Sequence, residues 1–366
     1  MRAAGPGQEG ASRGLGEGAR SDGEAEAERP RVGYLGPAGT FSEEALLSSA
    51  RPDAVEPVAF ATIYDTVIAV RRGEVRWAVV PIENSLDGSV TVTLDLLAET
   101  GTDQGDTRSA RIPESASAEG ACHPASVDEH GDLEIVGEAL LAVRHSLLAA
   151  EPVALSEIDT VISHPQVPGQ CTRLLRGELA HARVLPASST AEAVRVVATE
   201  RRRGQAALGT RLAADIYGAV VVREGVQDRD DNVTRFVWLA RTGSGPGDTA
   251  AGGAGEPPLR GEAESRPKSG SPGGGWKTSV VFWGAGADSP GWLVRCLDEF
   301  AKRGINLTKI ESRPRHGSLG HYMFFVDLQG GAGEPAVEQA LAGLRAVCEE
   351  VRVLGSYPAG EAPGGS

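Results

Sequence analysis

The sequence is constrained most by a repeated local pattern: an apolar run, then a few Gly, Ser, Thr or Asn residues, then a helical pattern. The first example is the apolar run 31–35, followed by Gly36, Gly39 and Thr40. The apolar runs that open the other examples are 77–82, 160–163, 184–185 and 206–208. Strands that alternate with helices are typical of an α/β fold with a largely parallel sheet. In such sheets, ligands bind where strands end and helices begin.

A second block, nearer the C-terminal end, has a different rhythm. It predicts the order strand, helix, strand, strand, helix, strand, which is ferredoxin-like. The predicted elements are, in turn, 278–284, 290–303, 305–311, 321–328, 335–348 and 351–354. A stretch of about 80 residues is long enough to form a small domain of its own.

Composition separates these two blocks from flexible stretches. The 366 residues include 48 Gly and 22 Pro, more than helices and strands can hold. Residues 1–30 contain no Val, Ile or Phe and are expected to be disordered, and 243–275 is expected to be a flexible linker. The polar stretch 100–131 predicts an inserted loop. The predicted domains are 31–242 and 276–358, followed by a tail at 359–366.

Charge and sequence patterns exclude several classes of protein. The net charge of −14 argues against a nucleic-acid partner. We expect a cytoplasmic protein, because no apolar run is long enough for a membrane span and no secretory signal is present. The four cysteines are scattered without C-x-x-C spacing, and the seven histidines form no metal-binding motif. Neither a disulfide framework nor a metal site is therefore expected.

Hydroxyl side chains at predicted helix starts indicate an anion-binding site. Thr40 with Glu43, and Ser189 with Glu192, have the spacing of capping boxes. Several helix starts at one sheet edge would present free N–H groups and positive helix ends to an anion. The glycines that would let a ligand approach the backbone are Gly36, Gly39, Gly88 and Gly209. A small di-acid suits this pattern better than a nucleotide, because no nucleotide-binding motif is present.

The strand predicted at 233–238 adds polar groups near the end of the first block. Alternation places Thr234 and Phe236 on one face of this strand and Arg235 on the other. From the residues alone, the chain is a small-anion-binding α/β unit joined to a ferredoxin-like unit of regulatory type.

At these residues the chain resembles the prephenate dehydratase family. The matching segments are G-Y-L-G-P-A-G-T-F-S at 33–42, V-P-I-E-N-S-L-D-G-S-V at 80–90, S-H-P-Q at 163–166, S-T-A at 189–191, A-A-L-G-T at 206–210 and N-V-T-R-F at 232–236. The second block resembles an ACT domain, with E-S-R-P at 311–314. The resemblance implies an α/β, two-lobed catalytic domain like that of periplasmic binding proteins, followed by a ferredoxin-like (βαββαβ) ACT domain.

The resemblance also implies a reaction: prephenate loses CO2 and water to give phenylpyruvate, in phenylalanine biosynthesis, with no metal or organic cofactor. The enzyme must orient a dianion and polarise the leaving hydroxyl. The resemblance assigns that polarising role to Thr234, with Asn84 and Ser189 as catalytic partners. The implied substrate-binding residues are Thr40, Phe41, Ser85, Gly88, Ser89, Gln170, Thr190, Gly209, Arg235 and Phe236.

The ACT resemblance implies feedback control by phenylalanine, bound between the first loop of this domain and a paired subunit. A homodimer or homotetramer is therefore expected. The implied effector residues are Ser289, Pro290, Gly291, Trp292, Leu293, Asn306, Leu307, Glu311, Ser312, Arg313 and Pro314. The family usually has G-A-L-V at this loop, so Trp292 replaces a small residue. Two outcomes stay open: the backbone contacts of the loop are kept, or the indole narrows or refits the effector pocket.

Two alternative functions stay open at this point. An arogenate dehydratase would use the same motifs on a substrate with an amino group in place of the keto group. A non-catalytic, two-lobed amino-acid sensor is the other alternative, and the intact T-R-F argues against it. A fused chorismate mutase is rejected, because residues 1–30 are too short and too rich in glycine for its helix bundle.

Overall fold

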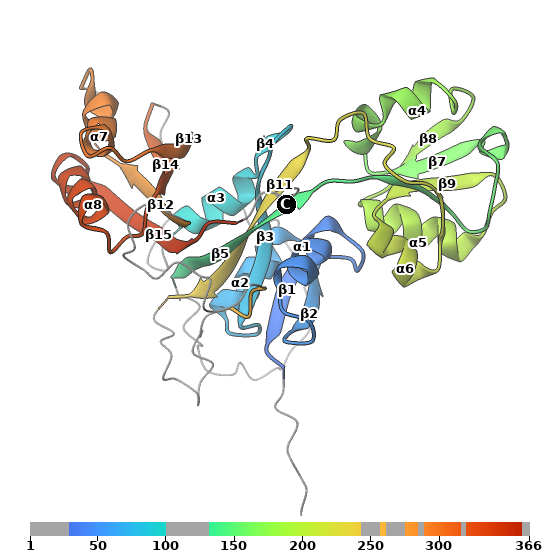
Figure 1. Ribbon diagram of the computed structural model, residues 1–366, viewed down its shortest axis with the longest axis horizontal. Coiled ribbons are helices and arrows are strands. Elements are labelled where there is room, and N and C mark those ends of the chain that lie inside the picture. Colours follow the sequence, from blue (N-terminus) through green and yellow to red (C-terminus); the bar gives the residue numbers. More distant parts are fainter. Residues whose placement is uncertain are drawn as a thin grey trace, which may run out of the picture.

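The computed structural model describes residues 29–99, 132–242, 257–260, 275–284, 289–315 and 320–360. Three sheets lie in a row along the longest axis of the molecule (Figure 1). The predicted disordered N-terminal stretch, the predicted insert at 100–131 and the predicted tail lie almost entirely outside the described residues. Among the described helices, none is both long enough and apolar enough to cross a membrane.

The central sheet forms lobe 1. Its strand order is β2-β1-β3-β11-β5, and the short β4 pairs with β3. The strands are β1 Arg31–Leu35, β2 Glu56–Phe60, β3 Trp77–Asn84, β4 Gly88–Ser89, β5 Leu133–Ala142 and β11 Val233–Arg241. The helices of this lobe are α1 Phe41–Ser49, α2 Ile63–Arg71 and α3 Thr91–Ala98.

The second sheet forms lobe 2, with strand order β10-β6-β9-β7-β8. Its strands are β6 Ser146–Ala149, β7 Thr160–Ser163, β8 Arg183–Pro186, β9 Gln205–Gly209 and β10 Val220–Arg223. Its helices are α4 Thr172–Arg176, α5 Thr190–Glu200 and α6 Arg211–Tyr217, with the 3₁₀ turns η1 Leu155–Glu157 and η2 Val167–Gln170. The chain enters this lobe after β5 and leaves it before β11, so two segments connect the lobes (Figure 1).

The prediction of a largely parallel sheet is wrong. Strand β1 runs parallel to β2 and β3, and β7 runs parallel to β8 and β9. Strand β11 runs antiparallel to both of its neighbours, and so does β6. The chain returns to lobe 1 from the cleft side, so β11 enters this sheet against the direction of β3. This return places Thr234, the second residue of β11, at the cleft.

The third sheet is the ferredoxin-like unit, and its elements follow the predicted order. They are β12 Trp276–Trp283, α7 Trp292–Ala301, β13 Leu307–Pro314, β14 Tyr322–Gln329, α8 Pro335–Val347 and β15 Glu350–Pro358. The strand order is β13-β14-β12-β15, with every pair antiparallel. Val280 and Phe282 of β12 face the helices, whereas Val281, between them, faces lobe 1.

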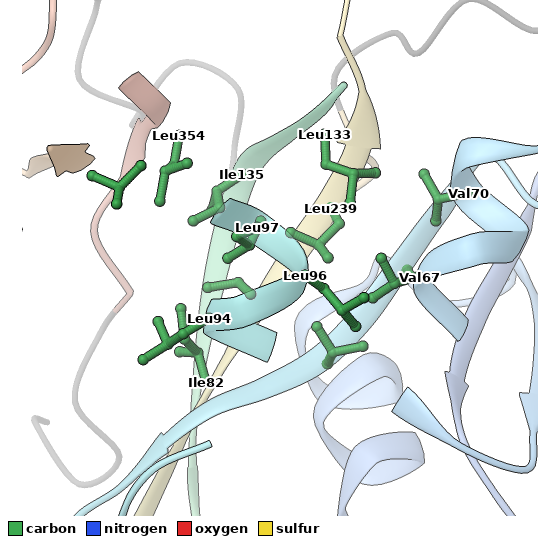
Figure 2. Close-up of a cluster of buried hydrophobic side chains, with 14 of the residues drawn as sticks. Val67, Val70, Ile82, Leu94, Leu96, Leu97, Leu133, Ile135, Leu239 and Leu354 are labelled. Atoms are coloured by element: carbon green, nitrogen blue, oxygen red, sulfur yellow. The ribbon is translucent and has the colours of Figure 1, made fainter. Parts of the chain in front are cut away.

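A single apolar cluster joins this unit to lobe 1. Leu354 of β15 and Met323 of β14 belong to the same buried cluster as Leu97 of α3 and Ile135 of β5. Figure 2 shows Leu354 near Leu97 and Ile135. The third sheet therefore buries one face under its own helices and the other against lobe 1.

Part of the predicted flexible linker is docked on lobe 1. Leu259 pairs with Ala50 in an isolated antiparallel bridge, beside the end of α1. The N–H of Arg51 donates to the carbonyl of Pro258 at 2.7 Å, and the N–H of Arg260 donates to the carbonyl of Ser49 at 2.7 Å. Leu259, the only Leu, Ile or Val of the linker, packs against the buried cluster of lobe 1. The prediction of flexibility is therefore wrong for 257–260.

Candidate active site

The cleft between the two lobes holds a cavity of about 910 Å³. Lobe 1 contributes the ends of β1 and β3 and the start of α1, and lobe 2 contributes the η2 turn and the start of α5. Residues of both connecting segments complete the wall. The predicted site residues that line this cavity are Thr40, Phe41, Asn84, Gly88, Ser89, Gln170, Ser189, Thr190 and Thr234. The antiparallel return of β11 is what brings Thr234 and Asn84 side by side.

A chain of neutral hydrogen bonds crosses the floor of the cavity. The Nδ2 of Asn84 donates to Thr234 Oγ1 and to Asn232 Oδ1, each at 2.8 Å. The Nδ2 of Asn232 donates to Gln170 Oε1 at 3.1 Å, and His145 Nε2 lies 3.1 Å from the same oxygen. The two lobes and both connecting segments are thus held in one hydrogen-bond network.

The network fixes which groups can still donate to a ligand. The Oδ1 of Asn84 accepts from the N–H groups of Leu86 and Asp87 at 2.9 and 3.0 Å, so its amide nitrogen must face Thr234. Because Thr234 Oγ1 is an acceptor there, its own proton stays available, and none of the described residues accepts it. Thr234 can therefore donate a hydrogen bond into the cavity.

Two helix N-termini open onto the cavity. Thr40 caps α1 by accepting from the N–H of Glu43 at 3.4 Å, and Ser189 caps α5 by accepting from the N–H of Glu192 at 3.0 Å. In a capping box, the glutamate side chain would also accept from the N–H of the capping residue. Here Glu43 instead accepts from Gly39 N at 2.5 Å, and Glu192 pairs with Arg195. The hydroxyl caps are confirmed. The positive ends of both helices favour an anion in the cleft.

His145 is a cavity residue that the sequence prediction missed. Its ring meets Phe41 edge-on, with 5.4 Å between ring centroids. Burial lowers the pKa of His145, so the neutral imidazole is favoured, and its contact with Gln170 Oε1 requires a proton on Nε2. A histidine before a strand carries no local pattern that marks it. Further lining residues, Asn232, His164 and Gln166, lie within segments that carried the resemblance.

Four predicted substrate-binding residues lie outside the cavity. Phe236 is on the same side of β11 as Thr234, but farther along the strand and buried in the core beside α1. A side chain on Gly209 would meet Val194 of α5 at 2.3 Å, so this glycine serves helix packing. Ser85 Oγ accepts from the N–H of Val233 at 3.0 Å and clamps β11 to the end of β3.

Arg235 is the fourth, and it points away from the cavity, as strand alternation requires. Its Nε donates to Glu138 Oε2 at 2.7 Å, its NH2 group donates to Tyr357 Oη at 2.7 Å, and its NH1 group pairs with Asp327. Asp327 and Tyr357 belong to the third sheet, so Arg235 binds that unit instead of facing the cleft. Lys277 adds a second cation, 2.8 Å from Glu138.

The predicted effector residues do not meet within one chain. Ser289 to Leu293 follow β12, whereas Asn306 precedes β13 at the opposite end of the same sheet. Asn306 lines a second cavity of about 510 Å³ between the third sheet and lobe 1. Leu307 packs against the core of this unit, and the side chains of Glu311 and Arg313 face lobe 1, whereas Ser312 and Pro314 are exposed.

Trp292 does not stand in an open effector slot. Its side chain is buried against Phe282 and Phe324, and its Nε1 donates to the carbonyl of Val347 at 2.7 Å. The effect of this indole on an effector pocket shared with a second chain stays a prediction. The bulky residue fills the core beneath α7 and α8.

The fold and the cleft place the chain in a class of two-lobed α/β proteins with a binding site for a small anion between the lobes. In this chain a ferredoxin-like domain is attached to the two lobes. The family model described as prephenate dehydratase matches residues 32–244, and that of the ACT domain matches 285–346. The chain belongs to the prephenate dehydratase family, and it carries an ACT domain.

Named relatives agree over nearly the whole length. A prephenate dehydratase of Amycolatopsis methanolica is 37% identical, covering 89% of this chain and 88% of the relative. One of Mycolicibacterium vanbaalenii is 35% identical, covering 92% and 93%. A crystal structure of prephenate dehydratase in complex with L-Phe, from Arthrobacter aurescens, is 32% identical with a TM-score of 0.67, covering 90% and 89%.

Proposed function

We propose that this chain converts prephenate to phenylpyruvate by coupled loss of CO2 and water. The observation that carries this proposal is the Thr234 hydroxyl, which accepts from Asn84 and so keeps its own proton for the cavity. A positioned donor of this kind can polarise the leaving hydroxyl of the substrate. Loss of CO2 supplies the electrons that make the ring aromatic as the hydroxide leaves.

The two helix N-termini support binding of a dianionic substrate. The starts of α1 and α5 lie on opposite sides of the cleft, and Thr40 and Ser189 mark them. No lysine or arginine is among the lining residues that the structure describes. N–H groups and helix ends are therefore proposed to hold both carboxylates. In the described part of the chain, no three His, Cys, Asp or Glu side chains gather as metal ligands.

Product analysis tests this proposal. Purified protein is incubated with prephenate and, separately, with arogenate, and the products are identified by chromatography and mass spectrometry. We expect phenylpyruvate from prephenate at the higher kcat/KM. Preferential formation of phenylalanine from arogenate would assign the other dehydratase activity. No turnover of either substrate would favour a binding protein without catalysis.

L-Phenylalanine is the proposed effector of the ACT domain. The Arthrobacter relative was solved in complex with L-Phe, and the matched ACT domain of this chain has the ferredoxin-like order of elements. The loop before Trp292 and the Asn306 segment lie at opposite ends of one sheet. We therefore propose that a second chain completes the effector site, and that the protein is at least a dimer.

Calorimetry and light scattering test the effector proposal. We expect saturable L-Phe binding to the wild type, loss of binding in Asn306→Ala, and a scattering mass of at least two chains. A wild-type protein that scatters as a monomer and still binds L-Phe saturably would contradict a site shared between two chains. The expected location in the cytoplasm stays a prediction.

A further inference from the structure

The ACT domain reaches the wall of the proposed substrate cavity. Alternation along β13 turns Lys309, Glu311 and Arg313 toward lobe 1. Arg313 forms an ion pair with Asp95 of α3, with its NH2 group 2.6 Å from Oδ2. Strand β13 therefore contacts α3, which lies on the side of lobe 1 that faces the ACT domain (Figure 1).

Two charged side chains of β13 bind one residue that lines the cavity. Ser89 Oγ donates to Glu311 Oε2 at 2.7 Å, and Lys309 Nζ donates to Ser89 Oγ at 2.6 Å. Ser89 belongs to β4 and lines the cavity, whereas Lys309 and Glu311 do not. Ser89 thus connects strand β13 of the ACT domain to the wall of the cavity.

The positive charge of Lys309 is balanced beside the cavity. Its side chain is only 7% exposed, and its Nζ lies 3.2 Å from Glu83 and 3.9 Å from Glu311. Two carboxylates therefore hold this ammonium group in place. Glu83 also lies 3.8 Å from Arg235, so Lys309 and Arg235 share one carboxylate.

The hydrogen bonds of Ser89 leave it without a proton for an anion. A serine hydroxyl has one proton and two acceptor positions. Here the proton is donated to Glu311, and Lys309 occupies one acceptor position. What remains of this hydroxyl is one acceptor position, which does not bind a carboxylate. Ser89 can serve as a donor only after its hydroxyl turns away from Glu311.

We propose that Glu311 is a positioning residue of the substrate cavity, which holds the proton of Ser89 away from the substrate. This inference rests on the proposed function and concerns how the same site is regulated. A substrate carboxylate competes with the Glu311 carboxylate for one proton, while Lys309 keeps the Ser89 oxygen in place. The ACT domain thereby sets the affinity of the cavity in its own chain for an anionic substrate.

The variant Glu311→Gln tests the proposal, because an amide oxygen is a weaker acceptor than a carboxylate. We expect KM for prephenate to fall about threefold to tenfold, with kcat unchanged, since only binding improves. In a Ser89→Ala background, the same substitution is expected to leave KM unchanged. Asp95→Asn is the matched control, because it breaks an ion pair at the same interface without touching Ser89.

Four proteins are compared with the wild type: the two single variants, their double variant and the control. Thermal unfolding confirms that each is folded. An unchanged or higher KM in Glu311→Gln would overturn the proposal, and so would an equal fall in KM in the Ser89→Ala background or in Asp95→Asn. A wild type that forms no phenylpyruvate would overturn the proposed function instead. In that case, calorimetry measures the affinity of the same proteins for prephenate. We expect Glu311→Gln to bind prephenate more tightly than the wild type, and the substitution to have no effect in the Ser89→Ala background.

Discussion

The two faces of the β3–β11 strand pair differ sharply in their chemistry. On the cavity face, Asn84 and Thr234 are register partners and carry no charge. On the opposite face, Glu83 and Arg235 are register partners and both are charged. One residue along each strand separates a neutral substrate site from an ionic domain interface.

The two faces differ in whether their polar groups already have partners within the protein. The ionic face is closed: Arg235 is bound by Glu138, Asp327 and Tyr357. Burial by itself lowers the pKa of Arg235, but these three groups raise the pKa above its usual value, so the cation is retained. On the cavity face the groups are neutral and the proton of Thr234 is unused. A buried charge needs its partners within the protein, whereas a substrate site must keep donors for its ligand.

The largest effect is expected on the ionic face. Arg235→Ala would remove the cation that pairs with buried Asp327 and leave buried Glu138 with Lys277, and breaking such a buried pair costs about 3–5 kcal/mol. Chemical denaturation should show this loss in the free energy of unfolding. Arg235→Lys is the control and should retain part of the stability. A variant with wild-type stability and a raised KM would instead place Arg235 at the substrate.

The cavity face is tested by Thr234→Ala. We expect kcat to fall at least about 100-fold, the loss typical of one positioned donor, with little change in unfolding free energy. Thr234→Ser keeps the hydroxyl and should retain most of the activity. Steady-state kinetics with prephenate separates the two variants. Comparable rates for Thr234→Ala and the wild type would remove this hydroxyl from the mechanism.

The smallest effect concerns His145, the titratable member of the cavity network. Because burial lowers its folded pKa, the unfolded chain binds the proton more readily. The free energy of unfolding is therefore unaffected by His145 above about pH 6.5. Below that pH it falls, by at most about 1.4 kcal/mol per pH unit. Denaturation curves between pH 5 and 8 should show this slope, less steep in His145→Gln. His181→Gln, an exposed control, should keep the full slope.

Much of the site was predictable because the roles of its residues follow from helix capping and from alternation along a strand. Thr40 and Ser189 cap helices, and Thr234 and Arg235 alternate across a strand. Local spacing determines both features. Phe236 and Gly209 were misassigned for a related reason. They are neighbours of site residues along the chain, but depth in the core and helix packing decide their contacts.

By itself, the sequence determined the two domains, the order of the elements in the ACT domain and the group of hydroxyl and amide side chains at the cleft. Only the tertiary structure decided the partners of Arg235, the place of His145 and the contact between Ser89 and Glu311. The last two residues are 222 positions apart, and Arg235 and Tyr357 are 122 positions apart. Periodicity fixes which way a side chain points relative to its own strand. Which surface it then meets depends on how whole sheets pack, and that is decided by contacts distant in the sequence.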